Sequence, residues 1–463
     1  MTDTSHEQTD VLIIGGGPAG MMTGITAAQF WPGKRITVVR PEEEAVVPCG
    51  IPYIFGTLGG TDEDLAGRAP FLAAGGNLII DHVGALDLKA HTATLESGRI
   101  LAWERLVFAT GSVPFVPPIP GRELDGVFTV VKDYDYLDQL LTETLPGVKR
   151  LVVIGGGFIG VEFADELLKR GIEVHIVELR PHLLAASFDT DACTRVEEQL
   201  RNEGVHLHTG VTVTAIEPAE GGTRAGRVRL GDGNAIETDA VLLAIGARPN
   251  TKLAETTGLT MSRSGGIWVD GFQRCREHLD VFAVGDCAHK QDYFTRRASH
   301  ALLASQAAAE GRIAGMNLYA LRLPRANAGS IAVYASQVGN LAFGVAGLTE
   351  ETALAIGFEV FTGSSRLPDH HPASMPDTHE VFCRLIFDAT TERLLGGQVI
   401  GGPTTGELVN IIGVAIQLHA TAADLASFQF GSQPRLTAPV HPIVAACGDA
   451  LQKRAHCMQG SKS

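Results

Sequence analysis

The sequence lacks a long apolar segment. Its 463 residues contain no hydrophobic run long enough to span a bilayer, and residues 1–10 are polar, without the basic and then apolar pattern of a secretory signal. We therefore expect a cytoplasmic protein. Positive charge is also scarce, because 37 lysines and arginines face 52 aspartates and glutamates, giving a formal net charge of -15. This acidity argues against nucleic acid or an anionic membrane surface as the main partner.

Closely spaced cysteine pairs are absent. The seven cysteines are odd in number and never spaced as Cys-x-x-Cys, so neither a disulfide framework nor a zinc motif is indicated. They stand at positions 49, 193, 275, 287, 383, 447 and 457. Asp369, His370, His371 and His379 are irregularly spaced and favour a polar loop over a metal centre. We expect no metal site, and thiols that mostly stay reduced.

Glycine, by contrast, is abundant. A short apolar strand predicted at residues 11–14 runs into the motif GGGPAG and then into an alanine-rich helical stretch that ends at Phe30. A strand, a G-x-G-x-x-G turn and a helix in this order let backbone N–H groups and the helix end hold a pyrophosphate. Gly15, Gly17 and Gly20 are therefore candidate cofactor-binding residues.

A second copy of this block begins 140 residues later. LVVIGGGFIG repeats VLIIGGGPAG and is again followed by a helical stretch and a strand. Gly155, Gly157 and Gly160 hold the motif positions. Two such turns predict two bound dinucleotides.

The strands after the two turns end differently. The second strand ends at Glu178, whose carboxylate would accept from a ribose 2′-hydroxyl and repel a 2′-phosphate, which favours NADH over NADPH. Arg180 would pair with such a phosphate and leaves NADPH open. The first strand ends at Arg40, where an acid is expected, and glutamates follow at 42–44. The residue that meets this ribose therefore stays open.

Two further segments favour a flavin. VFATGS, which includes Ala109, Thr110 and Gly111, ends a strand in a small, flexible turn. VFAVGD is an apolar strand that ends at Asp286, whose carboxylate would bond the hydroxyls of a ribityl chain. As bare patterns, both segments are equally compatible with ordinary strand-to-loop junctions.

Cys49 lies in the segment VPCGIPY, about thirty residues after the first glycine turn. Gly50 would free the backbone, and Pro52 suits the first turn of a helix. A sulfur near the positive end of a helix is favoured as a reactive thiolate. The alternative is a buried, inert cysteine.

The sequence pattern changes from about residue 330 onward. Helical stretches at 407–419 and 443–454 follow short strand-like runs at 331–334, 341–345, 381–387 and 395–400. This order is typical of a separate α+β domain.

Taken together, GGGPAG, PCGIPY, ATGS, GGGFIG, AIGARPN and VGD resemble the motifs of the pyridine nucleotide-disulfide oxidoreductase family, over nearly the whole chain. The resemblance implies an α/β fold with two Rossmann-like dinucleotide-binding domains plus a C-terminal α+β dimerisation domain, and hence a homodimer. The implied domains are an FAD-binding domain at 1–125 and 246–329, an NAD-binding domain at 126–245 and a dimerisation domain at 330–463. Gly246, within AIGARPN, and Glu162, which matches a family residue near the nicotinamide, join the implied cofactor-binding residues.

Within that family, one cysteine in the context Cys-Gly-Ile-Pro-Tyr is similar to the single-cysteine branch of coenzyme A disulfide reductases, persulfide reductases, NADH oxidases and peroxidases. Two-cysteine members carry a redox pair separated by four residues. Here the positions five before and five after Cys49 hold Glu44 and Ile54. The resemblance therefore implies Cys49 as the redox-active residue.

Three positions depart from these relatives. The first glycine turn has Pro18 and Ala19 where oxidases and peroxidases commonly carry a histidine, which disfavours peroxide chemistry. Residues 26–30 lack the basic side chains that meet coenzyme A in its reductases, which disfavours coenzyme A. His441 precedes a proline. In this it is similar to the acid-base histidine of two-cysteine reductases, which the partner subunit supplies. The glutamate that orients that histidine is replaced here by Ala446. His441 is thus a candidate proton donor, and a surface histidine is the alternative.

We predict reduction of a small disulfide or persulfide by NADH through FAD, with Cys49 and His441 as catalytic residues. The oxidised enzyme would hold Cys49 as a mixed disulfide, persulfide or sulfenate, unless Cys447 or Cys457 resolves it across the dimer. One alternative is an NADH oxidase, in which reduced flavin meets oxygen. Another is an electron-carrier flavoprotein that docks a protein partner, although such a protein has no need of Cys49.

Overall fold

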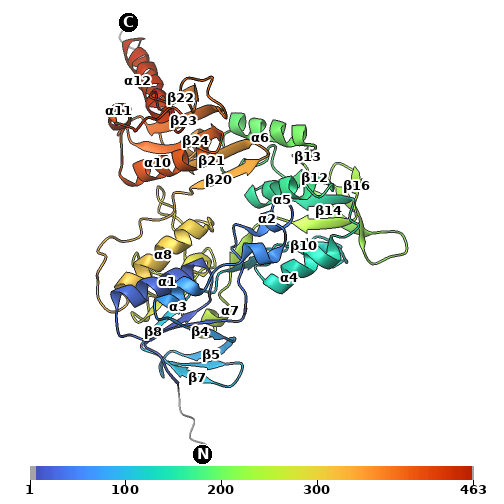
Figure 1. Ribbon diagram of the computed structural model, residues 1–463, viewed down its shortest axis with the longest axis vertical. Coiled ribbons are helices and arrows are strands. Elements are labelled where there is room, and N and C mark those ends of the chain that lie inside the picture. Colours follow the sequence, from blue (N-terminus) through green and yellow to red (C-terminus); the bar gives the residue numbers. More distant parts are fainter. Residues whose placement is uncertain (1–6, 461–463) are drawn as a thin grey trace, which may run out of the picture. The chain divides into compact units, whose positions relative to one another are not determined.

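The computed structural model describes residues 7–460, shown in Figure 1. Residues 1–6, part of the polar start for which we predict no signal segment, lie outside it, as do residues 461–463. No helix in the described part of the chain is both long and apolar enough to cross a membrane.

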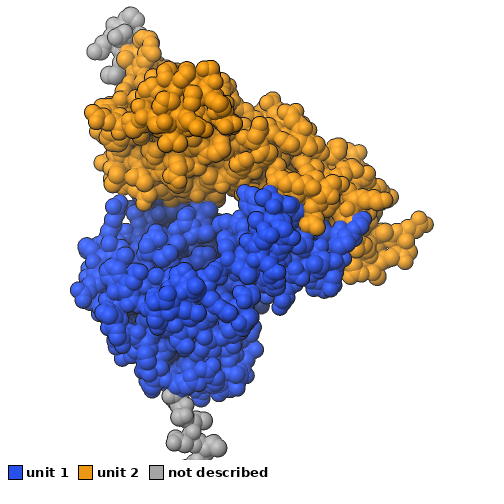
Figure 2. Space-filling view, in the orientation of Figure 1, with its two compact units in different colours: residues 1–117, 129–147, 245–330 blue, residues 118–128, 148–244, 331–463 orange. Residues whose placement is uncertain are grey.

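The chain folds into two compact units, which Figure 2 colours separately. Unit 1 comprises residues 1–117, 129–147 and 245–330, and unit 2 comprises residues 118–128, 148–244 and 331–463. Each unit is therefore assembled from separate stretches of the sequence. The division into FAD-binding, NAD-binding and dimerisation domains at the boundaries given above stays a prediction.

Unit 1 is built around a parallel five-stranded sheet in the order β19-β8-β2-β3-β4. Its strands are Val281–Ala283 (β19), Arg105–Phe108 (β8), Val11–Ile14 (β2), Ile36–Arg40 (β3) and Asn77–Ile80 (β4). All four side chains of β2 are apolar and buried, as expected of a strand that is covered on both faces. Because the strands are parallel, the turns after β2, β8 and β19 meet at the carboxyl edge of the sheet, where such folds bind ligands.

Helices α1 (Pro18–Phe30) and α8 (Ala304–Asn317) pack against each other in unit 1 (Figure 1). Buried alanines of both helices belong to the core of the parallel sheet. A four-stranded sheet of β1 (Glu7–Gln8), β7 (Ile100–Ala102), β6 (Thr92–Leu95) and β5 (Val83–Asp87) and an antiparallel pair of β9 (Ser112–Pro114) and β18 (Ala247–Pro249) complete its strands. The remaining helices and turns are α2 (Ile51–Ile54), η1 (Thr61–Asp64), α3 (Ala69–Ala73), α4 (Tyr134–Gln139), η2 (Leu140–Thr144), α7 (Lys252–Glu255) and η3 (Gly285–Cys287).

Unit 2 contains the second predicted nucleotide fold. Its five-stranded sheet has the order β10-β17-β11-β12-β13, with strands Val127–Thr129, Ala240–Leu243, Arg150–Ile154, Glu173–Glu178 and His206–Thr209. Helix α5 (Phe158–Leu168) follows β11, and α6 (Thr190–Glu203) precedes β13. A three-stranded antiparallel sheet consists of β14 (Val213–Pro218), β15 (Ala225–Leu230) and β16 (Ala235–Glu237).

The C-terminal part of unit 2 is an antiparallel sheet in the order β20-β21-β24-β23-β22, accompanied by helices (Figure 1). The strands are Tyr334–Val338, Leu341–Gly347, Leu394–Gly401, Glu380–Asp388 and Val360–Pro368 in that order, and the helices are α9 (Glu350–Ala355), α10 (Thr405–Gln417), α11 (Ala422–Ser427) and α12 (Pro442–Gly460).

One strand of this sheet was misplaced from the sequence and another was missed. The strand predicted at 331–334 begins only at Tyr334, because Ala332 has a positive φ of 55° and cannot lie in an extended strand. The edge strand β22 escaped prediction because its glycine and serines interrupt the apolar pattern.

Candidate functional site

The first glycine turn forms a narrow cradle after β2. Gly15 has a φ of 109°, and an added Cβ there would lie 2.2 Å from the carbonyl oxygen of Ala109. An added Cβ at Gly20 would lie 2.0 Å from the carbonyl oxygen of Gly15. At Gly17, the N-cap of α1, nothing lies within 4 Å of an added Cβ. The turn is thus closed toward the protein and open at the helix start, which suits a pyrophosphate.

Arg40, at the end of β3, lies directly beneath this turn. The side chain is 1% exposed, and an added Cβ at Gly16 would lie 2.4 Å from Arg40 Cδ. One terminal nitrogen donates to the carbonyl oxygen of Glu43 at 2.7 Å, whereas Arg40 Nε has no hydrogen-bond partner among the described residues. A buried donor without an acceptor is costly, so its position beside the turn fits a bound cofactor that supplies the acceptor.

Asp286 lies in η3 after β19, at the same edge of the sheet. Its carboxylate accepts from Ser112 Oγ at 2.7 Å and from Lys132 Nζ at 3.0 Å. Burial alone would raise the pKa of Asp286, but the Lys132 ammonium and the Ser112 hydroxyl outweigh it and hold the pKa below its ordinary value. Asp286 is therefore ionised at neutral pH and suited to accept hydrogen bonds from hydroxyl groups, and its contact with the ribityl chain stays a prediction.

A buried ion pair holds the backbone next to Asp286. Lys290 Nζ lies 2.8 Å from Glu310 Oε2, and both side chains are at most 2% exposed. Glu310 Oε2 also accepts from the N–H of Gly285 at 2.9 Å, while Lys290 Nζ donates to the carbonyl oxygen of Gly285. The pair therefore clamps both polar groups of the residue that precedes Asp286.

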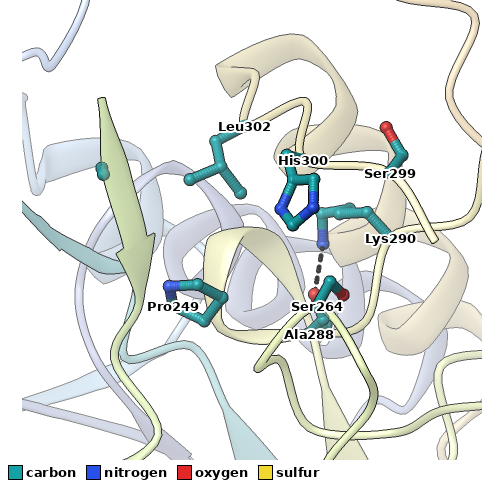
Figure 3. Close-up of a pocket in the computed structure, with 8 residues that line it drawn as sticks. Pro249, Ser264, Ala288, Lys290, Ser299, His300 and Leu302 are labelled. Carbon is teal, nitrogen blue, oxygen red and sulfur yellow. Dashed lines mark hydrogen bonds between the residues drawn. The ribbon is translucent and has the colours of Figure 1, made fainter. Parts of the chain in front are cut away.

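A small pocket of unit 1 opens beside this clamp (Figure 3). Lys290 lines it, and its Nζ donates to the carbonyl oxygen of Ala288 at 3.2 Å. The other lining residues are Ala247, Pro249, Ser264, Ser299, His300 and Leu302. Lys290 therefore lines a pocket and fixes the Gly285 backbone at once.

The segments ATGS and AIGARPN meet in the β9 and β18 pair. Thr110 Oγ1 donates to the carbonyl oxygen of Asn250 at 2.6 Å, and the Asn250 N–H donates to the carbonyl oxygen of Gly111 at 2.9 Å. Gly246 has a φ of 104°, and its carbonyl oxygen accepts from the N–H of Phe115 at 2.9 Å. Two motifs that are 140 residues apart thus form one antiparallel connection in unit 1.

Cys49 is exposed and precedes the short helix α2. Pro52 stands in the first turn of α2, as predicted. The role predicted for Gly50 is wrong, since its φ of -85° is open to any residue. An added Cβ there would lie 1.7 Å from Asp64 Oδ1, so a larger residue would have to displace the Asp64 carboxyl group. With only four residues, α2 gives the sulfur one helical turn rather than a long macrodipole.

Asp64 is a buried acid that no sequence motif indicates. It is 4% exposed, and its Oδ2 has no hydrogen-bond partner among the described residues. Burial raises the pKa of Asp64 to about 6. The carboxyl group is therefore partly protonated near pH 6. It lies against Gly50, one residue after Cys49.

The second glycine turn repeats the geometry of the first in unit 2. Gly155 has a φ of 112°, and an added Cβ at Gly160 would lie 2.0 Å from the carbonyl oxygen of Gly155. Gly157 is the N-cap of α5, with open space where a Cβ would stand. The same closed turn and open helix start suit a second pyrophosphate.

Glu178 takes the place beneath this turn that Arg40 takes in the first. Its Oε2 accepts from the N–H of Gly156 at 2.7 Å, and its Oε1 accepts from the N–H of Arg180 at 2.8 Å. Two backbone donors fix the carboxylate at the strand end. It is therefore positioned to accept from a ribose hydroxyl, which suits NADH.

Glu162 lies on α5, five residues after the N-cap Gly157. Ser336 Oγ donates to its Oε1 at 2.7 Å. Burial raises the pKa of Glu162 to about 7, against the opposing effect of the Ser336 hydroxyl. The group thus changes charge in the range where many enzymes work, as side chains at functional sites often do.

His441 immediately precedes α12 and is 7% exposed. Its ring stacks on Phe430 with centroids 3.9 Å apart, and its Nδ1 accepts from the N–H of Ile443 at 3.3 Å. Burial lowers the pKa of His441 to about 4. The single chain therefore holds His441 neutral at pH 7, in a form that accepts a proton rather than releases one.

The other cysteines differ from Cys49 in burial. Cys457, on α12, is exposed, whereas the remaining five are buried: Cys193, Cys275, Cys287, Cys383 and Cys447. Burial raises the pKa of the Cys447 thiol to about 12, so this thiol stays protonated in the single chain. Exposure thus separates Cys49 and Cys457 from the rest.

Residues 9–311 match the family model described as pyridine nucleotide-disulphide oxidoreductase, and residues 334–442 match the dimerisation domain of that family. The NADH oxidase of Methanocaldococcus jannaschii is 28% identical over 454 residues, which cover 96% of this chain and 98% of that protein. The NAD(P)H coenzyme A polysulfide/persulfide reductase of Pyrococcus horikoshii is 31% identical over 403 residues, or 84% of this chain and 87% of that protein.

Among solved structures, an NAD-dependent persulfide reductase from A. fulgidus has a TM-score of 0.88 to this fold. It is 27% identical in sequence, and the match covers 96% of this chain and 84% of that one. These similarities confirm the predicted fold class.

Proposed function

Because the chain belongs to the pyridine nucleotide-disulphide oxidoreductase family, we propose that it uses NADH to reduce a small disulfide or persulfide through Cys49. The observation that carries the proposal is the exposure of Cys49 in the segment that precedes α2, in contrast to the buried Cys275 and Cys287 of the same unit. A single exposed sulfur of unit 1 suits exchange with a small substrate and does not supply an internal disulfide.

Family membership confirms the broader predictions. The protein is an oxidoreductase that uses FAD and a pyridine nucleotide, and it carries a dimerisation domain. The residues around the first glycine turn fit the flavin nucleotide, because Arg40 Nε lacks an acceptor and the ionised Asp286 is ready to accept. When bound there, FAD would supply the two-electron link between the nicotinamide and sulfur.

Cys49 performs the exchange steps. Its thiolate attacks one sulfur of the substrate S–S bond, a mixed disulfide forms and a first thiolate leaves. Two electrons from NADH then break the mixed disulfide, the second thiol leaves with a proton, and the Cys49 thiolate is restored. In sum, NADH, one proton and a disulfide give NAD⁺ and two thiols. With a persulfide, one product is hydrogen sulfide.

The proton transfers fall to His441 of a second copy of the chain. A neutral His441 takes up the proton of a thiol and returns it to a leaving thiolate, which is acid-base catalysis in both directions. This assignment assumes a homodimer, for which the family's dimerisation domain at 334–442 is the support.

Coenzyme A is not the favoured carrier of the sulfur. Thr26 and Ala27 on α1 are buried, and the basic residues that follow the helix are already engaged. Lys34 Nζ lies 2.6 Å from Glu104, and Arg35 pairs with Asp10 at 3.4 Å. A substrate without phosphate groups therefore fits this part of unit 1 better.

An NADH oxidase is the second candidate, because one of the relatives over nearly the full length bears that name. The first glycine turn argues against an oxidase, because neither Pro18 nor Ala19 has a titratable side chain that could donate a proton to reduced oxygen. Oxygen uptake that outpaces disulfide reduction would favour the oxidase.

Cys49→Ser tests the proposal. The variant should retain FAD and its reduction by NADH, while turnover of glutathione persulfide, polysulfide or a small disulfide falls roughly a thousandfold or more, as expected when a nucleophile is lost. Stopped-flow spectra follow the flavin, and thiol release is assayed separately.

Cys457→Ser is the matched control, because it removes the other exposed thiol. It should leave turnover unchanged. Full turnover of Cys49→Ser with every substrate in the panel would reject the mechanism. Loss of turnover in Cys457→Ser would indicate that Cys457 forms a disulfide with Cys49 during turnover.

A further inference from the structure

Three histidines and a glutamate gather on two neighbouring strands of unit 2. Glu173 and His175 lie on β12, and His206 and His208 lie on β13. The two strands pair in parallel, with His175 directly opposite His206. Because side chains two residues apart share one face of a strand, all four project from the same face of the sheet.

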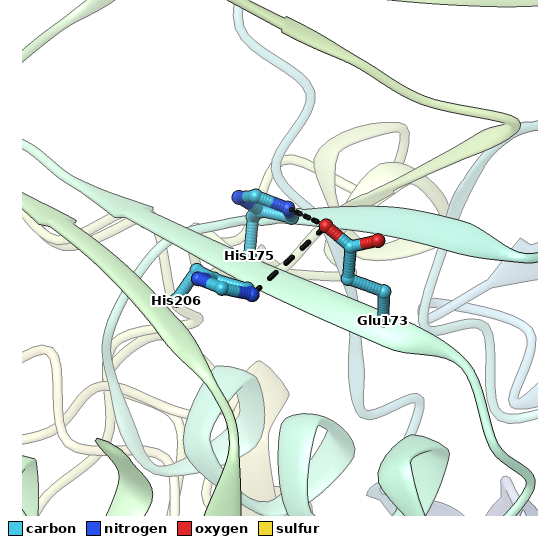
Figure 4. Close-up of side chains that lie close together, drawn as sticks. All are labelled: Glu173, His175 and His206. Carbon is cyan, nitrogen blue, oxygen red and sulfur yellow. Dashed lines mark hydrogen bonds and ion pairs between the residues drawn. The ribbon is translucent and has the colours of Figure 1, made fainter.

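The polar atoms of three of these residues converge, as Figure 4 shows. His175 Nε2 lies 3.0 Å from Glu173 Oε1, and His206 Nε2 lies 3.9 Å from the same oxygen. The three candidate ligand atoms all lie within 4.8 Å of one another. Two imidazole nitrogens and a carboxylate oxygen at such separations resemble the ligand set of three-ligand zinc sites.

His208 supports His175 from behind. Its Nε2 lies 3.0 Å from His175 Nδ1, and the two rings are stacked. If His175 carries its proton on Nδ1 and donates it to His208, the lone pair of His175 Nε2 points toward Glu173. Two facing lone pairs repel each other, and a cation between them removes that repulsion. Such an outer partner also fixes the orientation of a metal-binding imidazole.

Arg150 holds the carboxylate in place. Its Nε lies 3.0 Å from Glu173 Oε1, and a terminal nitrogen donates to Glu173 Oε2 at 3.1 Å. These contacts orient the carboxylate toward the histidines. They also place a positive charge near the cluster, which weakens the attraction for a second cation.

We propose that Glu173, His175 and His206 form a binding site for a divalent transition-metal ion of the zinc class. His175 and His206 bind through Nε2 and Glu173 through Oε1, while His208 and Arg150 orient the ligands. His206 is the most exposed of the three ligands, with 55% of its side chain accessible, so the remaining position of the ion faces solvent.

The protonation states agree with this assignment. Burial lowers the pKa of His175 and of His208, so both rings are neutral at pH 7. The hydrogen bond from Arg150, followed by that from His175, lowers the pKa of Glu173 to about 2. Neutral imidazole and ionised carboxylate are the forms that bind metal, and binding through His175 Nε2 also requires the proton of His175 to lie on Nδ1.

Equilibrium dialysis with Zn²⁺ tests the site. The protein is the full-length, FAD-loaded chain that carries Cys49→Ser and Cys457→Ser, because exposed thiols also bind zinc. About one equivalent of zinc should bind. His206→Gln should weaken binding by about tenfold or more, and this exposed position tolerates the change without loss of the fold.

The control is His82→Gln, which removes an exposed histidine of unit 1 and should leave zinc affinity unchanged. X-ray absorption should show nitrogen and oxygen ligands at about 2.0–2.1 Å and no sulfur. Equal zinc affinity in the parent and in His206→Gln, or a sulfur ligand, would overturn the assignment. These readouts do not depend on catalytic activity, so they stand apart from the proposed function.

Discussion

Asp64 lies against the backbone of Gly50, and its raised pKa has a consequence for stability. The folded protein binds the Asp64 proton more tightly than the unfolded chain, where the pKa is 3.8. The contribution of Asp64 to the free energy of unfolding is therefore largest below pH 3.8, and it is lost as the pH rises through about 6. The whole loss amounts to about 3 kcal/mol from the difference in pKa.

Asp64→Asn should remove this pH dependence, because the amide stays neutral. Relative to the parent protein, the variant should gain about 1 to 2 kcal/mol of unfolding free energy between pH 5 and pH 8. Thermal or urea unfolding of the FAD-loaded protein at both pH values measures the gain. Glu63→Gln, an exposed acid in the same turn, is the control and should show no such gain. A constant difference between Asp64→Asn and the parent would contradict the buried, protonated carboxyl.

Individual residues could be predicted where a motif constrains the backbone. Gly15 and Gly155 have the positive φ that the glycine motifs require, and Cys49 lies exposed in its motif. Asp64 and Lys132 could not be predicted, since each acts through a contact with another segment of the chain. Asp64 meets Gly50 from the next turn, and Lys132 reaches Asp286 across more than a hundred positions.

At the scale of elements, the Lys290 and Glu310 pair joins the η3 turn to helix α8. Both charges are nearly inaccessible, so each depends on the other for compensation. Because the pair binds the N–H and the carbonyl oxygen of Gly285, it also fixes the backbone that presents Asp286. Retention of FAD should therefore depend on this ion pair, which holds the residue immediately before the predicted ligand Asp286.

Lys290→Met should destabilise the protein by about 3 to 5 kcal/mol, since Glu310 is left as an unpaired buried charge. FAD should also dissociate faster. The flavin absorbance that stays with the protein after gel filtration measures retention, and thermal unfolding measures stability.

The double variant Lys290→Met/Glu310→Gln separates charge from packing. Its glutamine oxygen still accepts from Gly285 but carries no charge, so much of the stability and of the FAD should return. A double variant as unstable as Lys290→Met would mean that lost packing of the lysine stem, and not the orphaned charge, causes the defect.

Most elements could be predicted from the sequence pattern, because buried parallel strands have uniform apolar composition and each glycine turn is followed by a helix. β2 has the predicted bounds, Val11–Ile14, and α1 ends at Phe30 as predicted. The histidine cluster was not predicted, because its members come from two separate strands. The available signal was an alternation, Glu-x-His on β12 and His-x-His on β13, which becomes a cluster only when the strands pair.

At the scale of the whole molecule, the proposed mechanism needs two copies of the chain. His441 and Cys49 belong to different units, and the resemblance to two-cysteine reductases implies that the histidine serves the other subunit. Association and catalysis are then linked, since a lone chain would have an incomplete site.

Mixing Cys49→Ser chains with His441→Ala chains tests this link. Random pairing gives half heterodimers, each with one complete site of two, so about a quarter of the parent turnover should appear although each variant alone is slow. Persulfide turnover after co-expression and purification of the mixture measures the recovery. No recovery above the single variants would mean that His441 acts within its own chain or not at all.

The order of segments along the chain was predictable because the duplicated glycine turn marks two nucleotide folds and the later change of pattern marks a third region. The family resemblance implied a first domain of two stretches, 1–125 and 246–329, whereas unit 1 also includes residues 129–147. No local sequence pattern predicts that residues 129–147 belong to unit 1, because their place in the fold depends on contacts such as the one between Lys132 and Asp286.

The duplicated turns differ in the charge beneath them, with Arg40 under the first and Glu178 under the second. A sugar hydroxyl is both a donor and an acceptor, so a guanidinium and a carboxylate can each engage it from opposite ends of the same bond. We therefore expect the sign of the charge beneath each glycine turn to help distinguish the nucleotide that the turn binds.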